Sequence, residues 1–135
     1  MKTRYAVAVV IGALAVVPVL TLAGSRPSCA ADPRNAVSFQ EDVLPIFEVR
    51  CVVCHSPGKE GYEKSGVDLT SYAGVMKGTK YGPMIVPGNP DTSNLMRLLD
   101  WKVSPELRMP HNKKQISYCD RDSIRNWIRQ GAKDN

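Results

Sequence analysis

Histidine and cysteine are scarce in this chain, which has two histidines and four cysteines among its 135 residues. Three of these six residues nevertheless stand together, as Cys51, Cys54 and His55 in the run CVVCH. A structural zinc site would need a second pair of ligands, and a thioredoxin-like dithiol would need a βαβ setting around its cysteines. The sequence offers neither, because the other three residues of these kinds are scattered along the chain.

Alternation of apolar and polar residues, the mark of a half-buried strand, is absent from the sequence, and so are internal repeats. No second linker follows the flexible lead-in, residues 31–37, so the rest of the chain is expected to form one domain over residues 38–133. Short helices are expected within residues 70–76 and 95–99. These features predict a small all-α domain with long loops.

One amphipathic helix is expected at the start of this domain. Ser38 and Glu41 form a capping box, and the apolar residues that follow have helical spacing. The helix should run into Cys51 with a kink at Pro45, because proline removes one backbone hydrogen bond.

A second amphipathic helix is expected at the end of the domain. Ser117 and Asp120 form its capping box, and Gly131 suits the position just after its last residue. Its apolar stripe contains Trp127, which is expected to lie in the core.

A long uncharged run is present at the N-terminus, where residues 6–24 follow two basic residues and are divided by Pro18. This pattern predicts a signal peptide over residues 1–30, removed by cleavage after the last of them. Retention as a membrane anchor and lipid attachment at Cys29 are the alternatives. Cleavage would leave Cys119 without a partner, and it is then expected to be an inert thiol, buried or half-buried. The alternative is a reactive thiol or an intermolecular disulfide, because the helix N-terminus would favour its thiolate.

Strong net charge is also lacking once this segment is set aside. The whole chain has 18 basic and 13 acidic residues and a net charge of +5. The first 30 residues hold three basic residues and no acid, which leaves 15 basic against 13 acidic residues, a net charge of +2. Nucleic-acid binding therefore has little electrostatic support.

The CVVCH run has the spacing of a c-type haem attachment site. Thiols at Cys51 and Cys54 can reach the two vinyl groups on one edge of a haem, and the imidazole of His55 then lies under the iron as proximal ligand. The sequence thus predicts one covalent haem c. Trp101 and Tyr81 could donate to the haem propionates or cover the haem edge. Haem is attached outside the cytoplasm in bacteria, in agreement with an export signal.

The spacing of residues around this motif extends the pattern over residues 37–132, and it resembles class I c-type cytochromes, within them the planctomycete-type group. The residues that carry the resemblance are Phe39, Val43, Pro45, Val67 to Leu69, Val86 to Gly88, Ser93, Leu95, Met109-Pro110, Trp127-Ile128 and Gly131-Ala132. The resemblance implies that the first and last helices cross beside the haem. It also implies a distal methionine in a Met-Pro-Pro loop, which here reads Met109-Pro110-His111.

The loop before the last helix also favours Met109 by its position, because a distal ligand must come from the wall opposite the proximal one. A thioether is a soft, neutral ligand that favours reduced iron. His111 is an alternative ligand, as are Met76 and Met84, and an open site is a further alternative. Met96 lies in an apolar segment and is expected to pack in the core.

Iron with two protein ligands has no open position for a substrate, so the leading prediction is a periplasmic carrier of single electrons and not an enzyme. Its partners would be other redox proteins. One alternative is a haem sensor or peroxidase-like enzyme in which Met109 can be displaced. Another is a cytochrome subunit of a larger membrane oxidoreductase, held by an uncleaved N-terminal segment.

Overall fold

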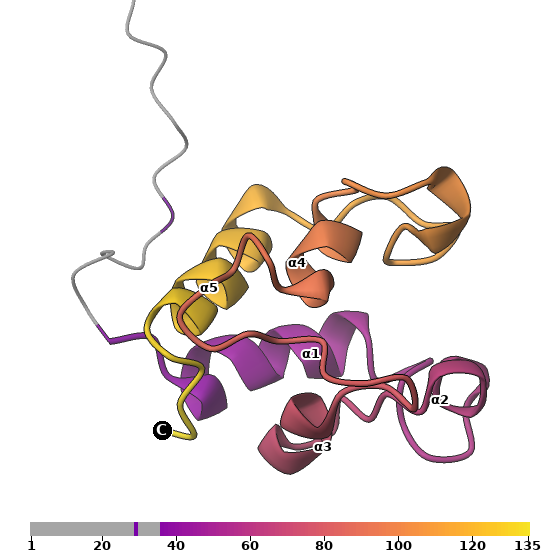
Figure 1. The fold of residues 1–135 in the computed structure, drawn as a ribbon, viewed down its shortest axis with the longest axis horizontal. Coiled ribbons are helices and arrows are strands. Elements are labelled where there is room, and N and C mark those ends of the chain that lie inside the picture. Colours follow the sequence, from indigo (N-terminus) through magenta and orange to yellow (C-terminus); the bar gives the residue numbers. More distant parts are fainter. Residues whose placement is uncertain (1–28, 30–35) are drawn as a thin grey trace, which may run out of the picture.

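A computed structural model describes residue 29 and residues 36–135 of the protein. The regular elements in this part of the chain are all helical: η1 (Phe39–Val43), α1 (Leu44–Arg50), α2 (Glu60–Ser65), α3 (Tyr72–Lys77), α4 (Asn94–Leu99), η2 (Pro105–Leu107) and α5 (Tyr118–Arg129) (Figure 1). Between the described residues the one β-type pairing is an isolated bridge from Thr79 to Gly82. The predicted all-α fold with long loops is confirmed.

The first helical segment has two parts. Ser38 caps it by accepting a hydrogen bond from the Glu41 amide, as the capping box predicts. The turn η1 has π-type geometry, since the Leu44 amide bonds to the Phe39 carbonyl five residues back. An α-helical part follows, with Pro45 in its first turn, where a missing amide hydrogen costs little. The change of helix type thus lies just before the proline, where a kink was expected.

The two terminal helical segments meet through an aromatic cluster. The rings of Phe39 and Tyr72 lie 5.3 Å apart between centroids, and the ring of Trp127 lies 5.3 Å from that of Phe39. Trp127 is 1% exposed, and its Nε1 donates to the Lys133 carbonyl at 2.8 Å. The prediction that Trp127 lies in the core is confirmed.

The C-terminal residue fastens the start of the domain. The Asn135 carbonyl oxygen accepts from the Gln40 amide at 3.1 Å and from the Ser38 hydroxyl at 2.6 Å. Its side-chain amide accepts from the Phe39 amide and donates to the Val37 carbonyl. Both ends of the described domain therefore lie together, at the end of the fold opposite α2 (Figure 1).

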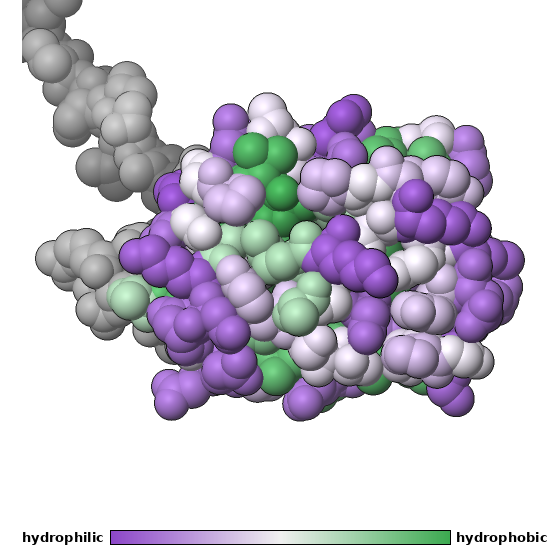
Figure 2. Space-filling model, turned by 60° about the horizontal axis from the view of Figure 1, so that its bottom comes forward, coloured by the Kyte–Doolittle hydropathy of each residue, from purple (hydrophilic) through white to green (hydrophobic). Residues whose placement is uncertain are grey.

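An ion-pair cluster joins α4 to α5. Asp100, at the C-terminal end of α4, accepts from Arg125 at 2.5 Å and lies 3.4 Å from Arg121. These three side chains are largely shielded from solvent, so their pairing fixes one helix against the other. Figure 2 shows one face of the molecule, on which hydrophilic side chains lie around a band of apolar ones and further apolar side chains appear near the edges.

Cys119 differs from its expected state as an unpaired thiol. It forms a disulfide with Cys29, with the two Cα atoms 5.2 Å apart, a separation suited to such a bond. The expectation of an unpaired thiol applied to a chain cleaved after Ala30, and for that form it stays a prediction. The predicted cleavage point and the uncharged run of residues 6–24 lie outside the described residues. Within the described residues no helix is long and apolar enough to cross a membrane.

Candidate functional site

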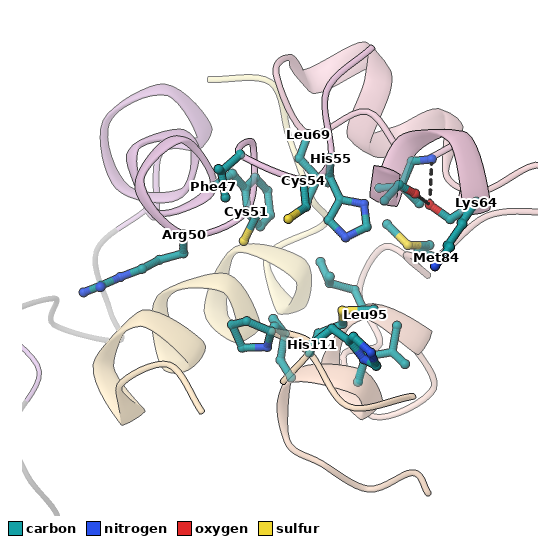
Figure 3. Close-up of a pocket in the computed structure, with 18 of the residues that line it drawn as sticks. Phe47, Arg50, Cys51, Cys54, His55, Lys64, Leu69, Met84, Leu95 and His111 are labelled. Carbon is teal, nitrogen blue, oxygen red and sulfur yellow. Dashed lines mark hydrogen bonds between the residues drawn. The ribbon is translucent and has the colours of Figure 1, made fainter. Parts of the chain in front are cut away.

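A pocket of about 520 Å³ lies between the end of α1, helix α2, helix α4 and the segment that follows η2 (Figure 3). Its walls are largely apolar, with side chains such as Phe47, Leu69 and Leu95 facing the space. Lys64 and Glu106 are among its charged residues. A cavity of this size with apolar walls is typical of a cofactor site.

The three residues of the CVVCH motif lie together on one wall of this pocket. Helix α1 ends at Cys51, whose amide bonds to the Phe47 carbonyl at 2.8 Å. The chain then turns, since the amides of Cys54 and His55 both bond to the Cys51 carbonyl, at 3.0 and 2.9 Å. This turn brings both thiols and the imidazole to the same space, as Figure 3 shows.

His55 is contacted by two other segments of the chain, at Leu69 and at helix α2. Its carbonyl accepts from the Leu69 amide at 2.9 Å, and helix α2 approaches its ring at Gly61. A Cβ atom at Gly61 would lie 2.9 Å from Cε1 of His55 and 2.7 Å from the Cys54 carbonyl oxygen. Sequence reasoning did not single out Gly61, because its role depends on a contact between a turn and a helix that follows it.

The pKa shifts of His55 and Cys51 favour a metal-binding imidazole over a redox-active dithiol. Burial lowers the pKa of His55, so its imidazole is neutral near pH 7, the form that binds a metal. Burial also raises the pKa of Cys51 to about 11, whereas a redox dithiol depends on a stabilised thiolate. The buried Nδ1 of His55 has no hydrogen-bond partner among the described residues, a cost that is typical of functional positions.

Several possible distal ligands reach the same pocket. Met109 and His111 both line it, as does the buried Met84. Met96 is 1% exposed within the core, so its predicted role in packing is confirmed. Met76 packs against the core and is not among the residues that line the pocket. The structure thus brings the expected ligand and two of its competitors to one cavity.

The loop that carries Met109 is bonded to the end of α4. The Met109 amide donates to the Leu98 carbonyl at 3.2 Å, and the Met109 carbonyl accepts from Nε1 of Trp101 at 2.9 Å. The indole donor of Trp101 is therefore used within the protein, which argues against donation to a propionate; the alternative, that the ring covers the haem edge, stays a prediction. Tyr81 is 82% exposed and does not line the pocket, and its contact with a bound haem stays a prediction.

The residues present fit a covalently attached haem. Two free thiols and an imidazole share one wall, and a thioether lies on the pocket lining supplied by a different part of the chain. The pocket's apolar walls suit the faces of a porphyrin, and no group of three or more His, Cys, Asp or Glu in the described part of the chain could hold a bare metal ion instead.

A comparison with protein families supports the same cofactor. Residues 51–112 match the family model described as planctomycete cytochrome C, and this stretch contains both the CVVCH turn and the Met109 loop. No curated protein and no solved structure matches the chain. A cytochrome c domain indicates haem binding and, in general terms, electron transfer. Residues 51–112 are therefore similar to a planctomycete-type cytochrome c domain, in agreement with the resemblance seen in the sequence.

Proposed function

We propose that the protein is an exported mono-haem c-type cytochrome that carries single electrons between redox partners. One observation supports this most directly: a single apolar pocket is lined by Cys51, Cys54 and His55 and also by Met109. In this proposal the two thiols hold the haem as thioethers, His55 is the proximal ligand and Met109 the distal one. The bound haem supplies an iron that accepts and releases one electron.

The other residues of the pocket adjust this chemistry without taking part in bond making. Phe47, Leu69 and Leu95 keep water from the site, which lowers the local dielectric and helps to set the potential. A thioether from Met109 favours reduced iron, so the potential should be higher than with a second imidazole. Two protein ligands also close the iron to substrates, which favours a carrier over an enzyme.

The periplasm is the proposed location, since haem attachment to CVVCH takes place outside the cytoplasm in bacteria and residues 1–30 have the pattern of an export signal. The proposed partners are donor and acceptor redox proteins, with no role for nucleic acid. If the N-terminal segment is retained, the same domain would serve as a cytochrome subunit of a membrane oxidoreductase.

A second function has one observation in its favour. His111 lines the pocket, is exposed, and lies two residues from Met109 in the same loop. A loop with two possible ligands suits a haem sensor or peroxidase-like enzyme in which the distal ligand is exchanged. The two functions differ in whether an external ligand can reach the iron.

Optical spectra of the purified haem-loaded protein, with and without carbon monoxide, distinguish the electron carrier from the sensor or enzyme. Ferrous wild-type protein should bind carbon monoxide poorly, and Met109→Ala should bind it readily at a lowered potential. If His111 replaces the lost ligand, the double variant Met109→Ala with His111→Ala should bind carbon monoxide where the single variant does not. Met76→Leu, which alters a methionine outside the pocket lining, is the matched control.

Rapid carbon monoxide binding by the wild type, with no change of spectrum or potential in Met109→Ala, would remove Met109 as ligand. The sensor or enzyme function would then be the better description.

A further inference from the structure

Trp101 occupies an unusual place at the end of α4. Its φ of 59° lies in the left-handed region, which glycine adopts freely and a large side chain does not. The turn around it is a helix-ending motif, since the Lys102 amide bonds to the Arg97 carbonyl at 2.9 Å and the Trp101 amide to the Leu98 carbonyl at 3.3 Å. Glycine would suit this backbone better, so the indole side chain needs another explanation.

The indole is used to hold the loop that carries the proposed distal ligand. Its Nε1 donates to the Met109 carbonyl at 2.9 Å, while the Met109 amide donates to the Leu98 carbonyl at 3.2 Å. The Met109 amide is therefore bonded to the last turn of α4, and the Met109 carbonyl to the side chain of the residue that follows the C-cap of this helix. Leu98 also lines the pocket, so the loop is fastened directly to a pocket wall.

The residue before the methionine adds a second contact. The guanidinium carbon of Arg108 lies 5.3 Å from the centroid of the Trp101 ring, within the range of a cation–π interaction. The ring thus contacts Arg108 through its face and Met109 through its nitrogen. Two consecutive residues of the loop depend on one side chain.

We propose that Trp101 is a positioning residue that fixes the Met109 loop against α4 and so keeps the thioether in the haem pocket. This inference rests on the proposed function, because it assigns Trp101 a role only if Met109 is the distal ligand. Loss of the indole hydrogen bond would release the loop more often and let an external ligand compete for the iron.

Two variants of the haem-loaded protein test this role. Trp101→Phe keeps an aromatic face for Arg108 and removes the donor to Met109. Trp101→Gly removes the side chain and also relieves the left-handed backbone, so the fold should keep its thermal stability. Tyr81→Phe, at an 82% exposed position, is the control for an aromatic substitution without effect on the loop.

The readouts are the rate of carbon monoxide binding to the ferrous protein and the sulfur-to-iron charge-transfer band of the ferric protein. Trp101→Phe loses one hydrogen bond, and the net free energy of one such bond corresponds to an increase on the order of fivefold in the rate of carbon monoxide binding. The charge-transfer band of this variant should weaken. Trp101→Gly should bind carbon monoxide at least as fast as Trp101→Phe while its melting temperature is unchanged or higher. A merely structural tryptophan would lower the melting temperature and leave both readouts unaltered.

Unchanged carbon monoxide rates in both variants, alongside a large increase in Met109→Ala, would overturn the role of Trp101 and leave the proposed function standing. If Met109→Ala itself has no effect, the ligand assignment fails, and the inference fails with it.

Discussion

Gly61 leaves no room for a side chain beside the CVVCH turn. Its backbone passes so close to the CVVCH turn that an added Cβ would lie 2.7 Å from the Cys54 carbonyl oxygen and 2.9 Å from Cε1 of His55. Neither neighbour can move easily, since the first is backbone and the second belongs to the proposed proximal ligand. The smallest side chain at position 61 should therefore act on the haem site itself.

Gly61→Ala is expected to displace the His55 imidazole or to move α2 away from it. The haem-loaded variant should show an altered ferric spectrum and a shifted reduction potential. Glu63→Ala, at an exposed position of the same helix, is the matched control and should match the wild type. Identical spectra and potentials for Gly61→Ala and wild type would contradict the close contact between the Gly61 backbone and the CVVCH turn.

The CVVCH motif could be interpreted from sequence because all of its information lies within five consecutive residues. The partner of the Trp101 indole could not, since it depends on a left-handed turn that tryptophan rarely adopts. Likewise, the Cys29–Cys119 disulfide joins residues 90 positions apart, a pairing that no local pattern reveals.

At the level of elements, the crossing of η1 with α5 depends on Trp127. The indole is buried against Phe39 and bonded to the Lys133 carbonyl, so its removal would leave both a cavity and an unsatisfied acceptor. The two terminal helices were predictable because each has a capping signal and an apolar stripe. Helix α2 was not, because its six residues, EGYEKS, have no such stripe.

Trp127→Ala should lower the free energy of unfolding of the haem-loaded protein by about 3–5 kcal/mol, as large aromatic truncations in cores do. Urea titration followed by circular dichroism measures this change. Tyr118→Ala, at an exposed position of the same helix, should change it by less than about 0.5 kcal/mol. A loss below about 1 kcal/mol for Trp127→Ala would contradict the packing described for this crossing.

For the whole molecule, haem attachment and N-terminal processing together determine how many thiols remain free. The structure pairs Cys119 with Cys29, and the haem would consume Cys51 and Cys54. A mature protein that keeps Cys29 should thus have no free thiol, whereas cleavage after Ala30 should leave one, at Cys119.

The intact mass of the protein, measured under denaturing conditions before and after maleimide treatment, shows whether the haem is attached and how many thiols are free. The mass should equal that of the processed chain plus one haem, and the haem should stay on the chain in acidic organic solvent. The number of maleimide additions should agree with the N-terminus found, none if Cys29 is present and one if it is absent. A haem that extracts freely would exclude covalent attachment. Two or more additions to a chain that lacks Cys29, or three or more to a chain that keeps it, would exclude thioethers at both cysteines.

The contacts of Asn135 with Val37 and its neighbours have a consequence for how the domain can be mounted. Any segment joined after residue 135 leaves the fold from the end opposite α2 (Figure 1). The turn that carries CVVCH lies towards the other end. A tether or fused domain attached after residue 135 would therefore lie away from the CVVCH turn, and would leave the haem side free to face incoming and outgoing electron carriers.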